Sequence, residues 1–147
     1  VYAYGEGLII NAEDNTAYPD LTPLKDQVVG VQAGTIFYDQ LNKLGIFKEI
    51  RTYDSIGEMV RDLFLGRIKA AVGDQPVVAY QIRQKLFKGV KLAADYQPVN
   101  VGEVCLVVRK GDAQTLERLN TAIASIKADG TLDSILKKWG LDTQVRP

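Results

Sequence analysis

The segment from Val28 to Asp39, VVGVQAGTIFYD, is the feature that most constrains the fold of this chain. Its run of β-branched valines favours a strand, and a helical pattern begins directly after Gly34 and Thr35. A strand that turns straight into a helix is the repeating unit of an open α/β sheet. In such sheets, ligands bind beyond the carboxyl ends of the strands, where the next helix presents free N–H groups.

Strand and helix patterns alternate through the middle of the chain. Apolar spacing predicts strands over residues 28–33, 48–53, 69–73 and 90–94, separated by helices over 36–44, 56–65 and 74–89. A short strand over 7–10 precedes them, and a longer strand over 101–109 and two amphipathic helices within 112–140 follow. We therefore predict an α/β fold, a three-layer αβα lobe with a mostly parallel sheet, plus a C-terminal helical tail. When the strands over 28–33, 48–53 and 69–73 are counted as 1, 2 and 3, the predicted order is 2-1-3 with added strands.

Composition excludes several function classes. The 147 residues carry 18 basic and 18 acidic side chains, so no charge excess favours nucleic acid or an anionic membrane. The chain has no histidine, and its one cysteine, Cys105, is expected to be a small buried apolar group. No apolar run reaches the roughly 20 residues of a membrane span. The first residue is Val1, not Met, which indicates a processed or cut chain.

Two strand ends combine glycine with a polar residue at a helix start. The first is Gly34-Thr35, where a hydroxyl and the helix amides of Thr35 and Ile36 suit a carboxylate. The second is Gly73-Asp74, where a negative charge suits an ammonium group. With strand order 2-1-3 the two ends border one crevice, so together they would bind an α-amino acid.

Structural roles for the same residues stay open at this point. Thr35 could be only an N-cap, and Asp74 could only stabilise the N-terminus of its own helix. Gln32 is more often a satisfied polar group at a strand end than a ligand contact. No glycine-rich phosphate loop, carboxylate pair or nucleophile–base pair stands out, so no cofactor, metal or catalytic residue is expected.

Several phrases resemble a known family when they are taken in order. They are VVGVQAGT, YDSIGEMVRDLFLGRIKAAVGDQPVVAY, GEVCLVVRKGD and LNTAIASIKADGTLDSILKKWG. This series resembles the bacterial extracellular solute-binding proteins of the polar amino-acid ABC uptake family, which have a periplasmic-binding-protein fold of two lobes around a ligand. The resemblance extends from Gly5 to Gly140.

The resemblance implies a domain organisation. Residues 1–10 look like a crossing strand, and residues 11–100 look like lobe two entire. Residues 101–147 look like the return strand and the C-terminal helices that would complete lobe one. The chain is thus similar to the C-terminal part of such a receptor, and the exposed apolar faces of its last helices predict self-association.

The resemblance also implies which residues bind ligand. Gly34, Thr35 and Ile36 look like the carboxylate-binding edge, and Asp74 looks like the partner of the α-ammonium. Gln32 and Gln75 border the pocket. Many members have a second Thr or Ser where this chain has Ile36, so only a backbone donor is expected there.

The function implied is that of a solute-binding component for amino acids, periplasmic or extracellular, which works with a membrane permease and catalyses nothing. One alternative is the ligand-sensing ectodomain of a membrane receptor. Another is an enzyme similar to cyclohexadienyl dehydratase, in which Asp74 or Glu103 would act as acid or base.

Overall fold

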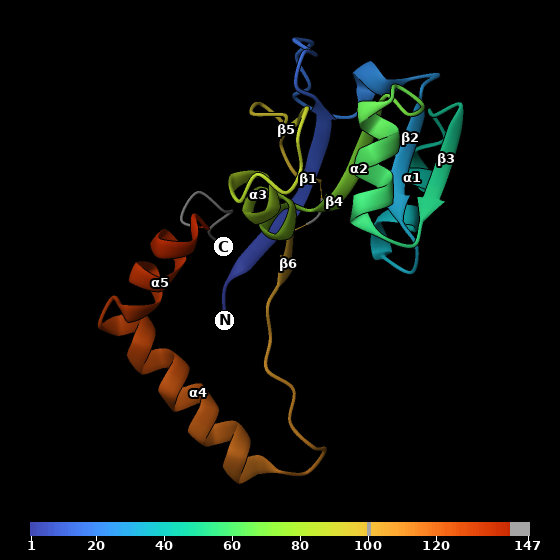
Figure 1. Ribbon diagram of the computed structural model, residues 1–147. Coiled ribbons are helices and arrows are strands. Elements are labelled where there is room, and N and C mark those ends of the chain that lie inside the picture. Colours follow the sequence, from blue (N-terminus) through green and yellow to red (C-terminus); the bar gives the residue numbers. More distant parts are fainter. Residues whose placement is uncertain (100, 142–147) are drawn as a thin grey trace. The chain divides into compact units, whose positions relative to one another are not determined.

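The computed structural model describes residues 1–99 and 101–141, which form two compact units (Figure 1). The larger unit begins at Gly5 and includes every described residue up to 99. The smaller unit combines residues 1–4 with the chain from Val101 onward. The first strand, β1 (Ala3–Asn11), contributes residues to both units.

The larger unit is built on a mixed sheet. Its other strands are β2 (Val28–Gln32), β3 (Glu49–Tyr53), β4 (Ala70–Asp74) and β5 (Val90–Leu92). Their order is β3-β2-β4-β1-β5. Strand β2 is parallel to β3 and β4, whereas β1 is antiparallel to β4 and β5. The predicted α/β class and the order of the three parallel strands are therefore confirmed, and β1 is the one strand of this unit that runs against the others.

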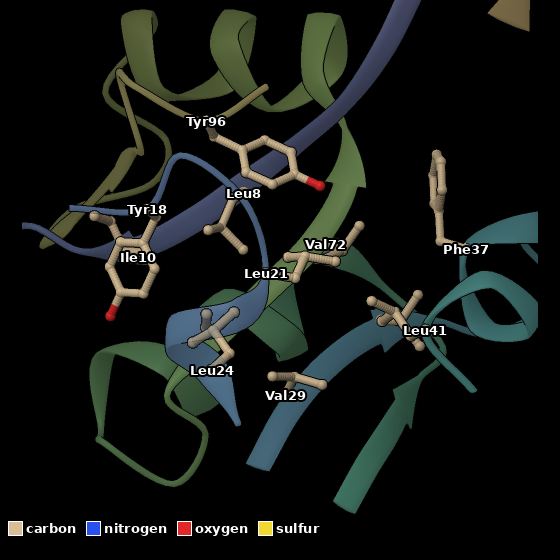
Figure 2. Packing of buried hydrophobic residues seen from close by; sticks show 12 residues of the cluster. Leu8, Ile10, Tyr18, Leu21, Leu24, Val29, Phe37, Leu41, Val72 and Tyr96 are labelled. Atoms are coloured by element: carbon tan, nitrogen blue, oxygen red, sulfur yellow. The ribbon is translucent and has the colours of Figure 1, made fainter. Parts of the chain in front are cut away.

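Helices cover both faces of this sheet, which gives the predicted three layers. Figure 1 shows α1 (Ile36–Leu44) and α2 (Ile56–Phe64) on opposite faces. Helix α3 (Gln75–Arg83) packs on the same face as α2, and a single 3-10 turn, η1 (Thr22–Leu24), follows the first loop. Each face has its own apolar cluster. Figure 2 shows the cluster under α1, where Phe37 and Leu41 pack with residues such as Leu8, Val29 and Val72.

Helix α3 is shorter than the sequence pattern predicts. It ends at Arg83 rather than near Gly89, because Lys85 takes a left-handed conformation with φ of 59°. The N–H of Leu86 then donates to the carbonyl of Gln81 over 3.0 Å, which closes the helix. A non-glycine residue in this conformation gives little signal in the sequence.

The smaller unit also differs from its prediction. The predicted strand over 101–109 is reduced to β6 (Val101–Glu103), which pairs with β1. Beside β6, the N–H of Val104 donates to the carbonyl of Tyr2, and the amino group of Val1 donates to the carbonyl of Val104. Cys105, expected to be buried, is exposed. Helices α4 (Ala113–Ala128) and α5 (Thr131–Trp139) follow as predicted.

Candidate functional site

The carboxyl ends of β2 and β4 lie next to each other. The two strands are parallel, with Val29 beside Ala70 and Val31 beside Val72. After β2 the chain leaves to α1 on one face, and after β4 it leaves to α3 on the other. Diverging crossovers from neighbouring parallel strands open a crevice at that edge of the sheet.

The turn between β2 and α1 exposes the start of the helix. Gly34 has a φ of +74°, a conformation that other residues adopt only with strain. Thr35 occupies the N-cap position, but its side chain caps no helix amide. Instead its Oγ1 donates to the carbonyl of Gln32 over 2.8 Å. The pure N-cap role for Thr35 is therefore wrong, and the first amides of α1 have no side-chain cap.

This hydrogen bond also revises how the turn can bind an anion. A hydroxyl has one proton, and that of Thr35 is directed to Gln32. The groups left to donate to a carboxylate are the backbone N–H groups at the start of α1. The Ile36 residue is 65% exposed, so its side chain does not pack into the core and does not bury the backbone N–H of Ile36.

The turn between β4 and α3 presents Asp74. Its side chain is half-buried and makes no cap hydrogen bond with α3. Within the described part of the chain, the recorded ion pairs join other residues, so no basic side chain neutralises Asp74. Asp74 therefore does not cap α3 through a hydrogen bond, although its charge still lies at the N-terminus of that helix.

A second carboxylate lies beside Asp74, and the sequence analysis missed it. Glu6 of β1 is the direct antiparallel partner of Asp74, which places both side chains on the α1 face of the sheet. Glu6 is only 3% exposed. Its Oε1 accepts the Tyr96 hydroxyl at 2.9 Å and the Val99 N–H at 2.7 Å. The sequence signal that could have identified Glu6 is a single acidic residue between Gly5 and Gly7, directly before the apolar residues 8–10.

The structure divides the six predicted site residues between two faces. Gly34, Thr35 and Ile36 start the helix that covers one face. Asp74 points to that same face because it lies two residues after Val72 on β4. Gln32 alternates with Val31 and points to the other face. Gln75 is on that other face too, since its Cβ lies 3.0 Å from where a side chain on Gly7 would begin.

Among the described residues, no three or more Asp, Glu or Cys side chains are grouped so that they could hold a metal ion. None of the described helices has both the length and the apolar character of a membrane span.

The chain is similar to a family of known proteins. The family described as bacterial extracellular solute-binding proteins, family 3, matches residues 1–142. The L-cystine-binding protein TcyJ of Escherichia coli is 32% identical over 91% of this chain and 46% of its own length. The histidine-binding periplasmic protein of Salmonella typhimurium is 31% identical over 95% of this chain and 55% of its own length.

A solved structure extends the comparison to the fold. The ancestral amino acid-binding protein AncCDT-1, described as a precursor of cyclohexadienyl dehydratase, is 28% identical and superposes with a TM-score of 0.69. The match covers 93% of this chain and 57% of that protein. The chain thus spans about half the length of the relatives it matches.

Proposed function

Because this chain belongs to the bacterial extracellular solute-binding proteins, family 3, we propose that it supplies half of an amino-acid binding site in the periplasm or outside the cell. Residues 11–100 form one lobe around the ligand. Residues 1–10 and the strand after residue 100 connect this lobe to another, which the C-terminal helices help to build. The whole receptor passes its ligand to a membrane permease of an ABC transporter.

One observation carries this proposal. An uncapped helix start and an unneutralised carboxylate lie at the ends of neighbouring parallel strands, on the same face of the sheet. The amides of α1 suit a carboxylate, because a helix N-terminus carries partial positive charge. Asp74 suits an α-ammonium group, and the adjacent Glu6 adds to the negative potential. Two like charges directly opposite each other destabilise a sheet, so a bound cation also relieves their repulsion.

The remaining predicted residues have secondary roles in this proposal. Gly34 gives the backbone the turn that exposes the amides. Gln32 and Gln75 border the crevice from the other face and would contact the ligand side chain. None of these groups forms a nucleophile–base pair, so the proposal is binding without catalysis.

An NMR titration of the 15N-labelled chain tests the proposal. We expect L-alanine to shift the amides of Ile36 and Phe37 and residues around Asp74, with an affinity in the millimolar range because half of the contacts are absent. N-acetyl-L-alanine, which lacks the ammonium group, should bind at least tenfold more weakly. The variant Asp74→Asn should lose this preference, whereas Asp133→Asn, an exposed aspartate on α5, should keep it.

Two outcomes contradict the proposal. Equal binding of the free and acetylated amino acids means that Asp74 does not bind the ammonium group. Micromolar binding by this chain alone means that the site is complete without another lobe.

The resemblance to AncCDT-1 favours one other candidate, a dehydratase. Such an enzyme needs a positioned acid or base, and Asp74 is the group at the crevice that could serve. Incubation of the chain with prephenate or arogenate distinguishes the two functions, since release of water and carbon dioxide from either compound supports catalysis. No turnover above the buffer control is expected.

A further inference from the structure

A cavity of about 220 Å³ lies between α1 and the sheet in the larger unit. Its walls include Phe37, Leu41 and Leu44 of α1 and Val72 of β4. Tyr96 and Glu6 also line it. Thr35, Ile36, Asp74 and Gln75 do not line it, although Phe37 follows Ile36 and Glu6 pairs with Asp74, so the cavity lies next to the proposed amino-acid edge.

The packing of α1 explains why this space is left unfilled. Phe37 and Leu41 point to the sheet and are buried, but Leu44, one turn further, is 44% exposed. Tyr96 cannot fill the gap with its ring, because its hydroxyl is held by Glu6 at 2.9 Å. Figure 2 shows Phe37 and the Tyr96 hydroxyl separated by this space, with Val72 below.

The chemistry of the walls limits what can enter. Most lining side chains are apolar, so the cavity favours an apolar molecule. The buried Glu6 carboxylate disfavours an anion, since charge repulsion is strong where water is excluded. Lys43 is at the rim, but it is exposed and its charge is solvated.

From these observations we propose that the cavity beneath α1 is a second binding site, which takes a small uncharged aromatic molecule. An apolar protein cavity of about 150 Å³ binds benzene. A cavity of about 220 Å³ therefore has room for one or two fused rings. This inference goes beyond the proposed amino-acid binding and does not depend on it.

Titration of the 147-residue chain, labelled on its Leu and Val methyl groups, with indole tests this inference. We expect saturable shifts of the methyl groups of Leu41, Leu44 and Val72. The variant Leu44→Trp fills the cavity from its rim and should weaken indole binding at least tenfold. Leu86→Trp is the matched control, because Leu86 is 67% exposed and does not line the cavity, and it should bind indole as the natural chain does.

A second ligand keeps the test independent of any variant. Indole-3-carboxylate has the same rings, but its charge would be buried near Glu6, so we expect its affinity to be at least tenfold lower than that of indole. The proposal is overturned if indole causes no saturable methyl shifts, if Leu44→Trp binds it unchanged, or if the two ligands bind equally. The L-alanine titration measures amino-acid binding at the crevice separately, so failure of one proposal can be distinguished from failure of the other.

Discussion

Single side chains distinguish the helix starts at the crevice from those of α2 and α4. Ser55 caps α2 by accepting the N–H of Glu58 at 3.2 Å, and Asp112 caps α4 by accepting the N–H of Thr115 at 3.0 Å. Thr35 and Asp74 hold equivalent positions and cap nothing. Since capping contributes about 1 kcal/mol, its absence at two adjacent helix starts is a stability cost that ligand binding would offset.

Asp14 is the residue that fixes the long loop after β1. Its carboxylate accepts Lys69 Nζ at 2.7 Å, the buried Tyr18 hydroxyl at 2.8 Å and the N–H of Thr16 at 2.9 Å. Burial by itself would raise the pKa of Asp14, but these hydrogen bonds outweigh burial and hold the pKa well below its usual range. The charged form of Asp14 is therefore tied to the folded state.

We expect Asp14→Asn to lower the free energy of unfolding by about 2 kcal/mol at pH 7, because hydrogen bonds to a charged group contribute about 1.5–3 kcal/mol. The folded-state pKa is below the unfolded value of about 3.9, so this stabilisation is complete above that value and is lost as the pH falls. Urea unfolding between pH 7 and pH 3 should show the gap between the two proteins closing below about pH 4.

The control for this prediction is Asp133→Asn, which changes an exposed aspartate on α5. Its effect should stay within about 0.5 kcal/mol. A constant difference between the natural chain and Asp14→Asn down to pH 3 would count against the role assigned to Asp14.

Among the elements, β2 determines where the crevice can form, because it lies between β3 and β4 at the centre of the parallel strands. Gly30 in its middle lets α2 approach closely. A Cβ at Gly30 would lie 2.6 Å from Ile68 Cδ1 and 3.1 Å from Met59 Cγ. Both neighbours are buried, so neither side chain has free space to move into.

Gly30→Ala should therefore reduce the free energy of unfolding by about 1–3 kcal/mol through overpacking. Gly57→Ala is the matched control in the first turn of α2, where the nearest atom to an added Cβ is Ser55 Oγ at 3.9 Å. Alanine favours helix over glycine, so this variant should gain about 0.5–1 kcal/mol. Urea unfolding of both variants measures the contrast, and equal effects would contradict this account of β2.

In the molecule as a whole, the described hydrophobic core belongs almost entirely to one unit. Both apolar clusters consist of residues from the larger unit. Helix α4 has no buried residue among its 16, and α5 buries only Leu132. Apolar side chains on these helices, including Leu116, Ile135 and Trp139, are 45–48% exposed. Apolar faces of this kind promote association.

We expect the chain to self-associate through α4 and α5, so that sedimentation velocity gives a mass that rises with concentration. Ile135→Lys should shift this equilibrium toward monomer, because it places a charge within the apolar face. Leu86→Lys changes a residue of the larger unit that is 67% exposed and should leave association unchanged. A monomer at all concentrations up to about 0.5 mM would refute the prediction.

The amino-acid sequence determined the elements of this protein and the order of its parallel strands. Apolar spacing and capping residues are local signals, and strand–helix alternation with right-handed crossovers places β2 beside β4. The adjacency of the Gly34-Thr35 turn to Asp74 follows from these signals alone.

Only the tertiary structure decided which groups share a face of the sheet. Glu6 joins Asp74 because β1 pairs antiparallel with β4, a contact between residues far apart in the chain. Gln32 and Gln75 are turned to the other face, and the proton of Thr35 is used within its own turn. Such outcomes depend on register and hydrogen-bond geometry between distant segments, which no local pattern of residues encodes.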